Sequence, residues 1–309
     1  MMRASWRRGT VTALSSVLAA SLLTGCTPEF EIKPWAVADH DEKVAYHADA
    51  GEKLLNLDAT ASLTKIESFQ ATGYLHLESD SNGSAHFEYV TSVEGESYVS
   101  RRVSSIEGDS FDQSHQAGSA YTYFLLGDRY KKQVSEGKTW VQLPMGDLDR
   151  MRNPESNCTL YSVAYMCYLV DAWNNTREQD ENVPVQLSRS ASGDQHFTTA
   201  VSYQSLSDVG LIPADGKFDG FLTDKARAKK LPLHLWVNGD GAVTKIEVNG
   251  TLTGDDDHSL RLQIGFEMTA TAPSGSMKPV TDDAIPGNDV LRITNRQQLD
   301  DFLRRLNSM

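Results

Sequence analysis

Positive charge is scarce in this sequence. Its 309 residues contain 29 lysines and arginines against 42 aspartates and glutamates, which gives a formal net charge of −13. Affinity for nucleic acids comes mainly from basic side chains that contact phosphates, and no basic stripe interrupts this acidic surplus. The composition therefore predicts that the protein has no nucleic-acid partner.

Long apolar runs are scarce as well. The one long run lies between Val11 and Leu23, which excludes a multi-pass membrane protein. Three arginines and no acidic residue precede the run, and its dozen or so residues are too few for a comfortable bilayer span. These features are typical of a secretory signal peptide, which we predict over residues 1–25.

The apolar run ends in Leu23-Thr24-Gly25-Cys26, which resembles the lipobox of bacterial lipoproteins. The resemblance implies cleavage after Gly25 and acylation of Cys26, so that the protein is held at the extracytoplasmic face of the cell membrane. Each acyl chain contributes about 0.8 kcal/mol per buried CH₂, so two or three chains give stable anchoring. Two alternatives stay open, namely an ordinary secretory signal with a coincidental cysteine, and twin-arginine export through Arg7-Arg8.

Cysteine is rare, with three residues in the whole chain. Apart from Cys26, only Cys158 and Cys167 remain, and thiols in an exported protein are prone to oxidation. We predict a structural disulfide between them. A continuous helix would hold their Cα atoms about 13 Å apart, whereas a disulfide requires less than about 7 Å. Residues 158–166 are therefore expected to form a loop or single turn, with the helix proper starting near Tyr165.

Catalytic and metal-binding motifs are also missing. The sequence has no Gly-x-Ser-x-Gly elbow and no His-Glu-x-x-His helix, so we expect neither an enzyme nor a cofactor. His76, His86 and His115 lie on separate predicted strands and could meet around zinc, but their polar-facing or edge positions favour a solvated surface. Residues 255–258 are acidic with one histidine and are interpreted as a solvated turn. No metal site is predicted.

The remaining sequence has the alternation of a sheet. Residues 26–44 lack apolar periodicity and are interpreted as a tether, while residues 44–66 have a helical pattern. Strands are predicted at residues 71–77, 87–93, 97–106, 110–116, 121–126, 130–134, 140–143, 185–191, 195–203, 233–237, 243–252 and 260–269. Helical segments are expected at 159–178, within 205–228, and at 295–306. We predict one α+β domain over residues 45–309, a strongly curved antiparallel sheet forming an unclosed half-barrel, with helices on its concave side.

The order of these features resembles the LppX/LprG-type lipoproteins of actinobacteria and, more distantly, the LolA/LolB lipoprotein carriers. The closest likeness lies in Tyr130 and Trp140 around a short polar turn, the helical insertion after them, and the hairpin of residues 233–248. The resemblance covers residues 46–272. It implies an unclosed barrel whose interior holds the acyl chains of a lipid or glycolipid. The chain departs from this pattern in the cysteine pair of the insertion and in the helix after Pro286.

A curved sheet with helices across its mouth can leave an apolar cavity of several hundred Å³, the usual setting for an apolar ligand. The inward-facing candidates for binding it are Leu75, Leu77, Phe87, Tyr89, Leu233, Leu235, Ile246, Val248, Leu262, Ile264 and Phe266. The alternative for each of them is a place in a filled core. The protein is thus predicted to be a monomeric, membrane-anchored lipid binder or carrier, or else a surface interaction or sensor module with the same fold and no ligand cavity.

Overall fold

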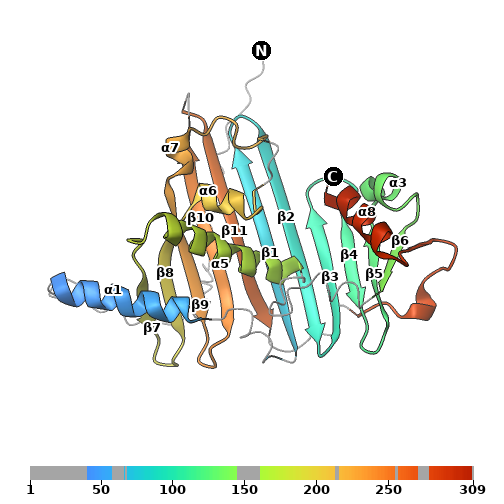
Figure 1. The fold of residues 1–309 in the computed structure, drawn as a ribbon, viewed down its shortest axis with the longest axis horizontal. Helices are drawn as coiled ribbons and strands as arrows, with labels where there is room; N and C mark the ends of the chain where they lie inside the picture. Colours follow the sequence, from blue (N-terminus) through green and yellow to red (C-terminus); the bar gives the residue numbers. More distant parts are fainter. Residues whose placement is uncertain are drawn as a thin grey trace, which may run out of the picture.

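The structure, a computed structural model, describes residues 40–57, 66, 68–144, 161–212, 216–254, 257–270 and 278–307. Twelve strands form a single sheet in the order β12-β6-β5-β4-β3-β2-β1-β11-β10-β9-β8-β7, shown in Figure 1. The strands are β1 Ser68–Ser79, β2 Gly83–Glu94, β3 Ser97–Ser104, β4 Phe111–His115, β5 Tyr121–Leu126, β6 Trp140–Pro144, β7 Gln186–Arg189, β8 Gln195–Ser202, β9 Lys230–Val237, β10 Val243–Thr253, β11 Ser259–Ala270 and β12 Val290–Arg292.

The sheet is built from two meanders that meet at its centre. Strands β1 to β6 run outwards in sequence order, and strands β7 to β11 return so that β11 pairs with β1. Neighbouring strands are antiparallel except for β12, which pairs with β6 in parallel. The outermost strands, β7 and β12, are not paired with each other. The sheet is therefore unclosed and mostly antiparallel, which confirms the α+β class and the open sheet.

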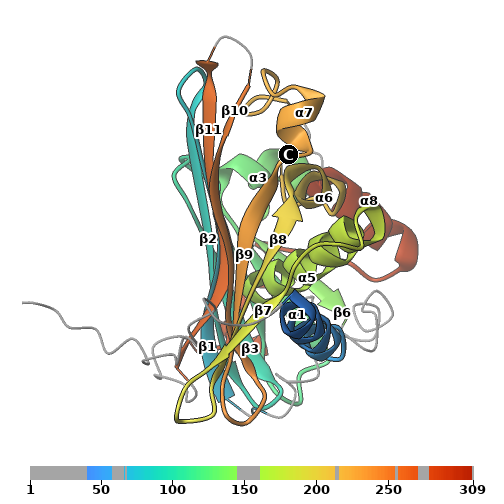
Figure 2. The ribbon, with the colours of Figure 1, turned by 90° about the vertical axis from the view of Figure 1, so that its left-hand side faces the viewer.

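All the described helices of four residues or more lie on one side of the sheet, as Figure 2 shows. They are α1 His40–Leu55, α3 Asp128–Val134, α5 Tyr161–Gln179, α6 Tyr203–Asp208, α7 Asp224–Arg227 and α8 Arg296–Asn307. Helix α5 crosses the middle of the sheet and contacts β1, β2, β8, β10 and β11. We call the side that carries these helices the helix-covered face, and the opposite side the outer face.

The helix-covered face contains two apolar clusters. The larger lies beneath α5 and α6 and includes Leu77, Met166 and Phe266, which are all fully buried. The smaller lies beneath α8 and is formed around Phe124, Val141 and Phe302. Alternation along β1, β9, β10 and β11 sends apolar side chains into the larger cluster and mostly polar ones to the outer face.

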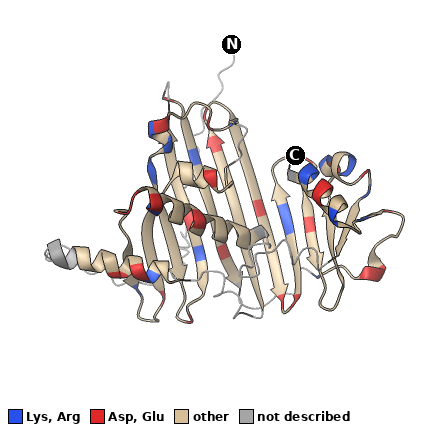
Figure 3. Cartoon of the chain, viewed as in Figure 1, with Lys and Arg blue, Asp and Glu red and all other residues tan. Residues whose placement is uncertain are grey.

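Charged residues of both signs are scattered over the sheet and the helices (Figure 3). No basic stripe is visible over the part of the chain that the structure describes. Among the described helices, none combines the length and apolarity that a membrane span requires.

Several elements differ from the sequence-based expectation in type or in where they begin. Helix α1 begins at His40, inside the segment interpreted as a tether. Residues 128–134 form helix α3 instead of a strand. The reason lies in their spacing, because Tyr130 and Val134 are four residues apart, share one side of a helix, and are both buried. Helix α5 begins at Tyr161, four residues before the expected start at Tyr165.

Strand β12 was not expected from the sequence. Its three residues, Val290–Arg292, are too few to display an alternation. The strand is positioned by long-range contacts, since the backbone N–H of Trp140 donates to Asp289 O at 3.1 Å and Thr139 N donates to the Asp289 carboxylate at 2.9 Å. The closing helix α8 follows almost at once, and its start at Arg296 agrees with the predicted residues 295–306.

Candidate functional site

The eleven residues predicted to face a ligand do share one face of the sheet. The strand register places Leu75 opposite both Phe87 and Ile264, and Leu77 opposite Leu262. Farther along, Ile264 pairs with Val248, and the same alternation continues across β10 and β9. Because residues directly opposite each other in a ladder point the same way, the set forms one continuous apolar face across five strands.

Most of this face is covered. Nine of the eleven side chains are at most 4% exposed, namely Leu75, Leu77, Leu233, Leu235, Ile246, Val248, Leu262, Ile264 and Phe266. Phe87 and Tyr89, on β2, are partly exposed. The cover is the apolar side of α5, whose Val163, Met166 and Leu169 have no exposed surface. In the described chain these residues pack together as a core.

Helix α5 is held close to the sheet at its first turn. A Cβ atom added to Gly73 would lie 2.7 Å from the Cα and the carbonyl oxygen of Ser162 and 2.7 Å from the ring of Tyr165. Only glycine allows the helix backbone to approach β1 this closely. At the other end of the helix, Trp173 Nε1 donates to Thr199 Oγ1 at 3.1 Å. Both contacts fix the helix against the apolar face.

Beyond α5, a partly buried arginine occupies the helix-covered face. The guanidinium of Arg102, on β3, lies 4.8 Å from the ring centroid of Phe87 and 5.7 Å from that of Tyr89. Its Nη2 donates to the Asp109 carboxylate at 2.9 Å, and its Nη1 donates to the Tyr130 hydroxyl at 2.9 Å. The Tyr130 hydroxyl also donates to Asp109. Burial and this carboxylate raise the pKa of Tyr130. The charge of Arg102 is thus compensated within the fold.

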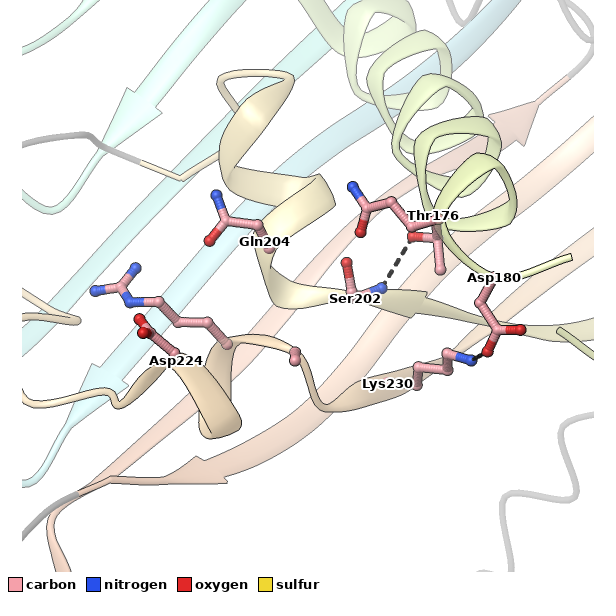
Figure 4. Close-up of a pocket in the computed structure, with 9 residues that line it drawn as sticks. Thr176, Asp180, Ser202, Gln204, Asp224 and Lys230 are labelled. Atoms are coloured by element: carbon pink, nitrogen blue, oxygen red, sulfur yellow. Dashed lines mark hydrogen bonds and ion pairs between the residues drawn. The ribbon is translucent and has the colours of Figure 1, made fainter. Parts of the chain in front are cut away.

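A pocket of about 380 Å³ lies elsewhere, where the end of α5 meets the ends of β8 and β9 and the short helices α6 and α7. Figure 4 shows the residues that line it, which are Thr176, Gln179, Asp180, Ser202, Gln204, Asp224, Arg227, Ala228 and Lys230. Almost all of them are polar or charged, and several are already paired. Lys230 forms an ion pair with Asp180, and Ser202 N donates to Thr176 Oγ1 at 3.0 Å. This lining does not suit an acyl chain.

The outer face carries an ordered polar row. His234, Glu247, Gly265 and Tyr74 lie opposite one another on β9, β10, β11 and β1. The Tyr74 hydroxyl donates to Glu247 Oε2 at 3.0 Å, and burial followed by the charge of Glu247 raises the pKa of Tyr74. Lys245 Nζ lies 3.0 Å from the same carboxylate oxygen of Glu247. The sequence alone does not reveal this row because its members are far apart in the chain.

One member of this row, His234, lies beside a second histidine and a tryptophan. His196 Nε2 lies 3.0 Å from His234 Nδ1. The His196 ring is stacked on Trp236 with centroids 4.6 Å apart and planes 8° from parallel. Burial, then the neighbouring His234, lowers the pKa of His196 to about 4, and burial also lowers the pKa of His234. The Leu233-His-Leu-Trp alternation signalled that His234 and Trp236 share a face, but it could not identify His196 as their neighbour.

The histidines considered at the sequence level do not converge. His76 and His86 face each other across β1 and β2, with ring centroids 4.8 Å apart. His115 lies in β4 and is only 4% exposed, so its expected polar or edge position is wrong; its Nδ1 lies 2.9 Å from Tyr121 O. Within the described ranges, no three His, Cys, Asp or Glu side chains come together to hold a metal ion. His258 is exposed, with its Nδ1 3.3 Å from the Asp80 carboxylate, and residues 255–256 lie outside the described part.

The predicted modification sites fall mostly outside the described residues. Cys26 and the signal peptide precede residue 40, and Cys158 lies in the gap between residues 144 and 161. Cys167 is buried in α5 with 7% exposure. Because α5 already includes the six residues before Cys167, the expectation of a loop over 161–166 is wrong. The acylation of Cys26 and the Cys158–Cys167 disulfide stay predictions.

Comparisons with known proteins give little. No protein-family model matches the chain, and no curated protein matches it. An uncharacterized conserved protein from Thermus thermophilus aligns with 79% of this chain and 99% of its own, at 8% identity and a TM-score of 0.26. A LolA superfamily protein from Nitrosomonas europaea aligns with 79% of this chain and 98% of its own, at 9% identity and a TM-score of 0.18. Scores this low carry no argument, and the LppX/LprG-type resemblance stays a prediction.

Proposed function

We propose that this protein is an extracytoplasmic lipoprotein, anchored through acylated Cys26, that binds or carries a lipid or glycolipid against its helix-covered face. It acts as a monomer and as a binding protein, not as an enzyme. The anchor is supported by the lipobox at Leu23–Cys26 and the apolar run before it. The binding role is supported by one observation, the continuous apolar face across five strands, which helix α5 contacts on β1, β2, β10 and β11.

Burial of the hydrocarbon chain of a lipid against such an apolar face is energetically favourable. Each buried CH₂ of an acyl chain contributes about 0.8 kcal/mol, so a chain that replaces side chains of α5 on the sheet recovers much of what their displacement costs. Phe87 and Tyr89 are the members of the face that are already partly exposed. A lipid would therefore first contact these two side chains, next to Tyr165, whose ring centroid lies 5.7 Å from that of Tyr89.

Detection of bound lipid in the purified protein is the direct test of this proposal. The variant Cys26→Ser, exported and purified without an acyl anchor, would be analysed by native mass spectrometry and by solvent extraction. Bound lipid in a fixed stoichiometry supports the proposal. A protein that carries no lipid after purification, and that takes up none from vesicles of its host's lipids, would contradict it.

A second candidate function is favoured by the burial of the apolar face beneath α5. Leu77, Ile264 and Phe266 have no exposed surface, and Gly73 lies in close contact with the first turn of α5. A core this well filled fits a surface interaction or sensor module that has the same fold and no ligand cavity. Substitution within the apolar face distinguishes this candidate from lipid binding.

A further inference from the structure

The outer face contains a histidine pair that neither the apolar face nor the lipobox explains. His196 lies on β8 and His234 on β9, and the two strands are hydrogen-bonded neighbours in which His196 is opposite Trp236. His196 Nε2 and His234 Nδ1 are 3.0 Å apart. The rings are nearly parallel, with centroids 5.2 Å apart, and His196 is also stacked on Trp236. Strand pairing and stacking therefore hold two ring nitrogens toward each other.

The separation of these nitrogens matches that of two ligands on one metal ion. Imidazole nitrogens bind transition ions at about 2.0–2.1 Å, so two of them at angles between 90° and 110° lie about 2.9–3.4 Å apart. The observed 3.0 Å falls within this interval. Small rotations of the two rings would direct both lone pairs to a shared ion on the solvent side of the sheet.

Replacing the hydrogen bond between the two rings by bonds to a metal ion needs no net loss of protons. In the hydrogen bond between the two rings, one of the facing nitrogens carries the hydrogen and the other accepts it. When an ion binds, that hydrogen is released and the same ring takes up a proton on its other nitrogen, so both imidazoles stay neutral. Each facing nitrogen then offers a lone pair, and the metal–nitrogen bonds replace the hydrogen bond between the rings and the 3.5 Å contact of His234 Nδ1 with Thr198 Oγ1.

The surroundings determine which ion is suitable. Glu247 lies opposite His234 on β10, but its carboxylate is engaged by Tyr74 and Lys245. No third His, Cys, Asp or Glu completes a metal-binding cluster among the described residues, so water would fill the remaining positions. Imidazole ligands follow the order in which Cu²⁺ binds more tightly than Ni²⁺ or Zn²⁺. We propose that His196 and His234 together chelate one divalent transition ion, with Cu²⁺ bound most tightly.

Trp236 provides a local signal for the test. Cu²⁺ quenches the fluorescence of an indole in close contact, and the Trp236 ring is stacked on one of the proposed ligands. Full-length protein in detergent, without a histidine tag, is titrated with CuCl₂. We expect saturable quenching with one ion per chain, and at least tenfold weaker binding in His196→Gln and in His234→Gln. The double variant His76→Gln/His86→Gln is the matched control, because it removes the other cross-strand histidine pair, and it should bind as the parent does.

Electron paramagnetic resonance of the Cu²⁺-loaded parent gives a second readout that does not depend on the variants folding. Hyperfine structure from two imidazole nitrogens is expected, and it should persist in Trp236→Phe, which loses the quenching signal. Three results would overturn the proposal. They are unchanged affinity in the His196→Gln/His234→Gln double variant, loss of binding in the His76/His86 control, and a parent spectrum with fewer than two nitrogens.

Discussion

Tyr74 reaches Glu247 across the backbone of an intervening strand, and its hydroxyl donates to the carboxylate at 3.0 Å. The strand between them is β11, and the residue in line with both is Gly265. A Cβ atom at Gly265 would lie 2.5 Å from the Tyr74 hydroxyl and 2.8 Å from Ile246 O. The tyrosine ring thus lies over the one position in the row without a side chain, which explains why Tyr74 is only 8% exposed on the outer face.

The first prediction concerns this glycine. Gly265→Ala should displace the Tyr74 ring and lower the free energy of unfolding by about 1–3 kcal/mol, as overpacking does. Urea denaturation followed by circular dichroism measures the loss. Gly51→Ala is the control, because the nearest atom to a Cβ there is 3.9 Å away and alanine favours a helix. Destabilisation of both variants to the same degree would argue against the role of the ring, as would full stability of Gly265→Ala.

The second prediction is a loss of stability in mild acid. Burial, followed by proximity to His234, lowers the pKa of His196 to about 4, against about 6.5 in an unfolded chain. Between these two values the unfolded state binds more protons than the folded state, so the free energy of unfolding decreases as the pH falls from about 6.5 to 4. The contribution of the neutral His196–His234 pair to the free energy of unfolding is fully present above about pH 6.5. We expect a loss of about 1–2 kcal/mol, since partial exposure reduces the full effect.

Urea denaturation at pH 7, 5.5 and 4.5, with a chelator present, measures this loss. The variant His196→Gln cannot titrate, so its stability should fall less over the same interval, and the difference between the two proteins isolates the imidazole from carboxylates that protonate at lower pH. Identical pH profiles for parent and variant would show that His196 does not titrate with a lowered pKa.

Much of the fold follows from the sequence because period-two alternation is a local signal. Strands β1 and β11 were predicted from Leu75, Leu77, Ile264 and Phe266, and the structure pairs these residues on one face. Helix α3 could not be recognised in the same way, because its seven residues begin at Asp128, and Gly127-Asp128 also resembles a hairpin turn. The four-residue spacing of Tyr130 and Val134 indicates a helix only when the neighbouring strands that bury both side chains are known.

The candidate sites were harder to predict, because they depend on contacts between segments that are far apart in the chain. Placement of apolar side chains on a shared face follows from alternation, but whether a helix fills that face depends on how closely α5 approaches Gly73. The pairing of His196 with His234 depends on strand register between segments 38 residues apart in the chain. Nothing in the local sequence of either histidine indicates the other.

The third prediction concerns the anchor. Cys26→Ser should release the protein from the membrane fraction and abolish acyl labelling, because the acyl chains provide the binding energy. Fractionation and labelling with an alkyne fatty acid measure both effects. Ser21→Ala, a change within the apolar run that leaves the lipobox intact, is the control and should remain in the membrane fraction. A Cys26→Ser protein that stays with the membrane would contradict the lipoprotein assignment.

The fourth prediction concerns the two other cysteines. A disulfide between Cys158 and Cys167 closes a loop of about ten residues and should stabilise the fold by roughly 2–3 kcal/mol. Peptide mapping without reductant should identify the linked peptide, and Cys158→Ser should lower the free energy of unfolding by a similar amount. Free thiols at both positions would rule out the bridge, and the stability of Cys158→Ser would then equal that of the parent.

The fifth prediction separates a lipid carrier from an interaction module. Ile264 is fully buried on the helix-covered face, whereas its neighbour Gln263 points to the outer face. If the helix-covered face opens to hold acyl chains, Ile264→Trp should block uptake of a fluorescent lipid at little cost in stability, because the indole enters space that the ligand would use. If the face is a permanently filled core, the same substitution overpacks it and costs about 1–3 kcal/mol or more.

Gln263→Trp adds the same ring on the other side of the strand and should leave lipid uptake near the parent value, with a small loss of stability because the hydrogen bond of Gln263 with the Tyr74 hydroxyl is removed. Thermal melts and fluorescent-lipid titrations on the Cys26→Ser background give the two readouts for each variant. A large loss of stability in Ile264→Trp alone, combined with no lipid uptake by the parent, would contradict the carrier and favour the interaction module. Uptake by the parent that Ile264→Trp abolishes and Gln263→Trp preserves would locate the lipid on the helix-covered face, because only the side of the strand differs between the two substitutions.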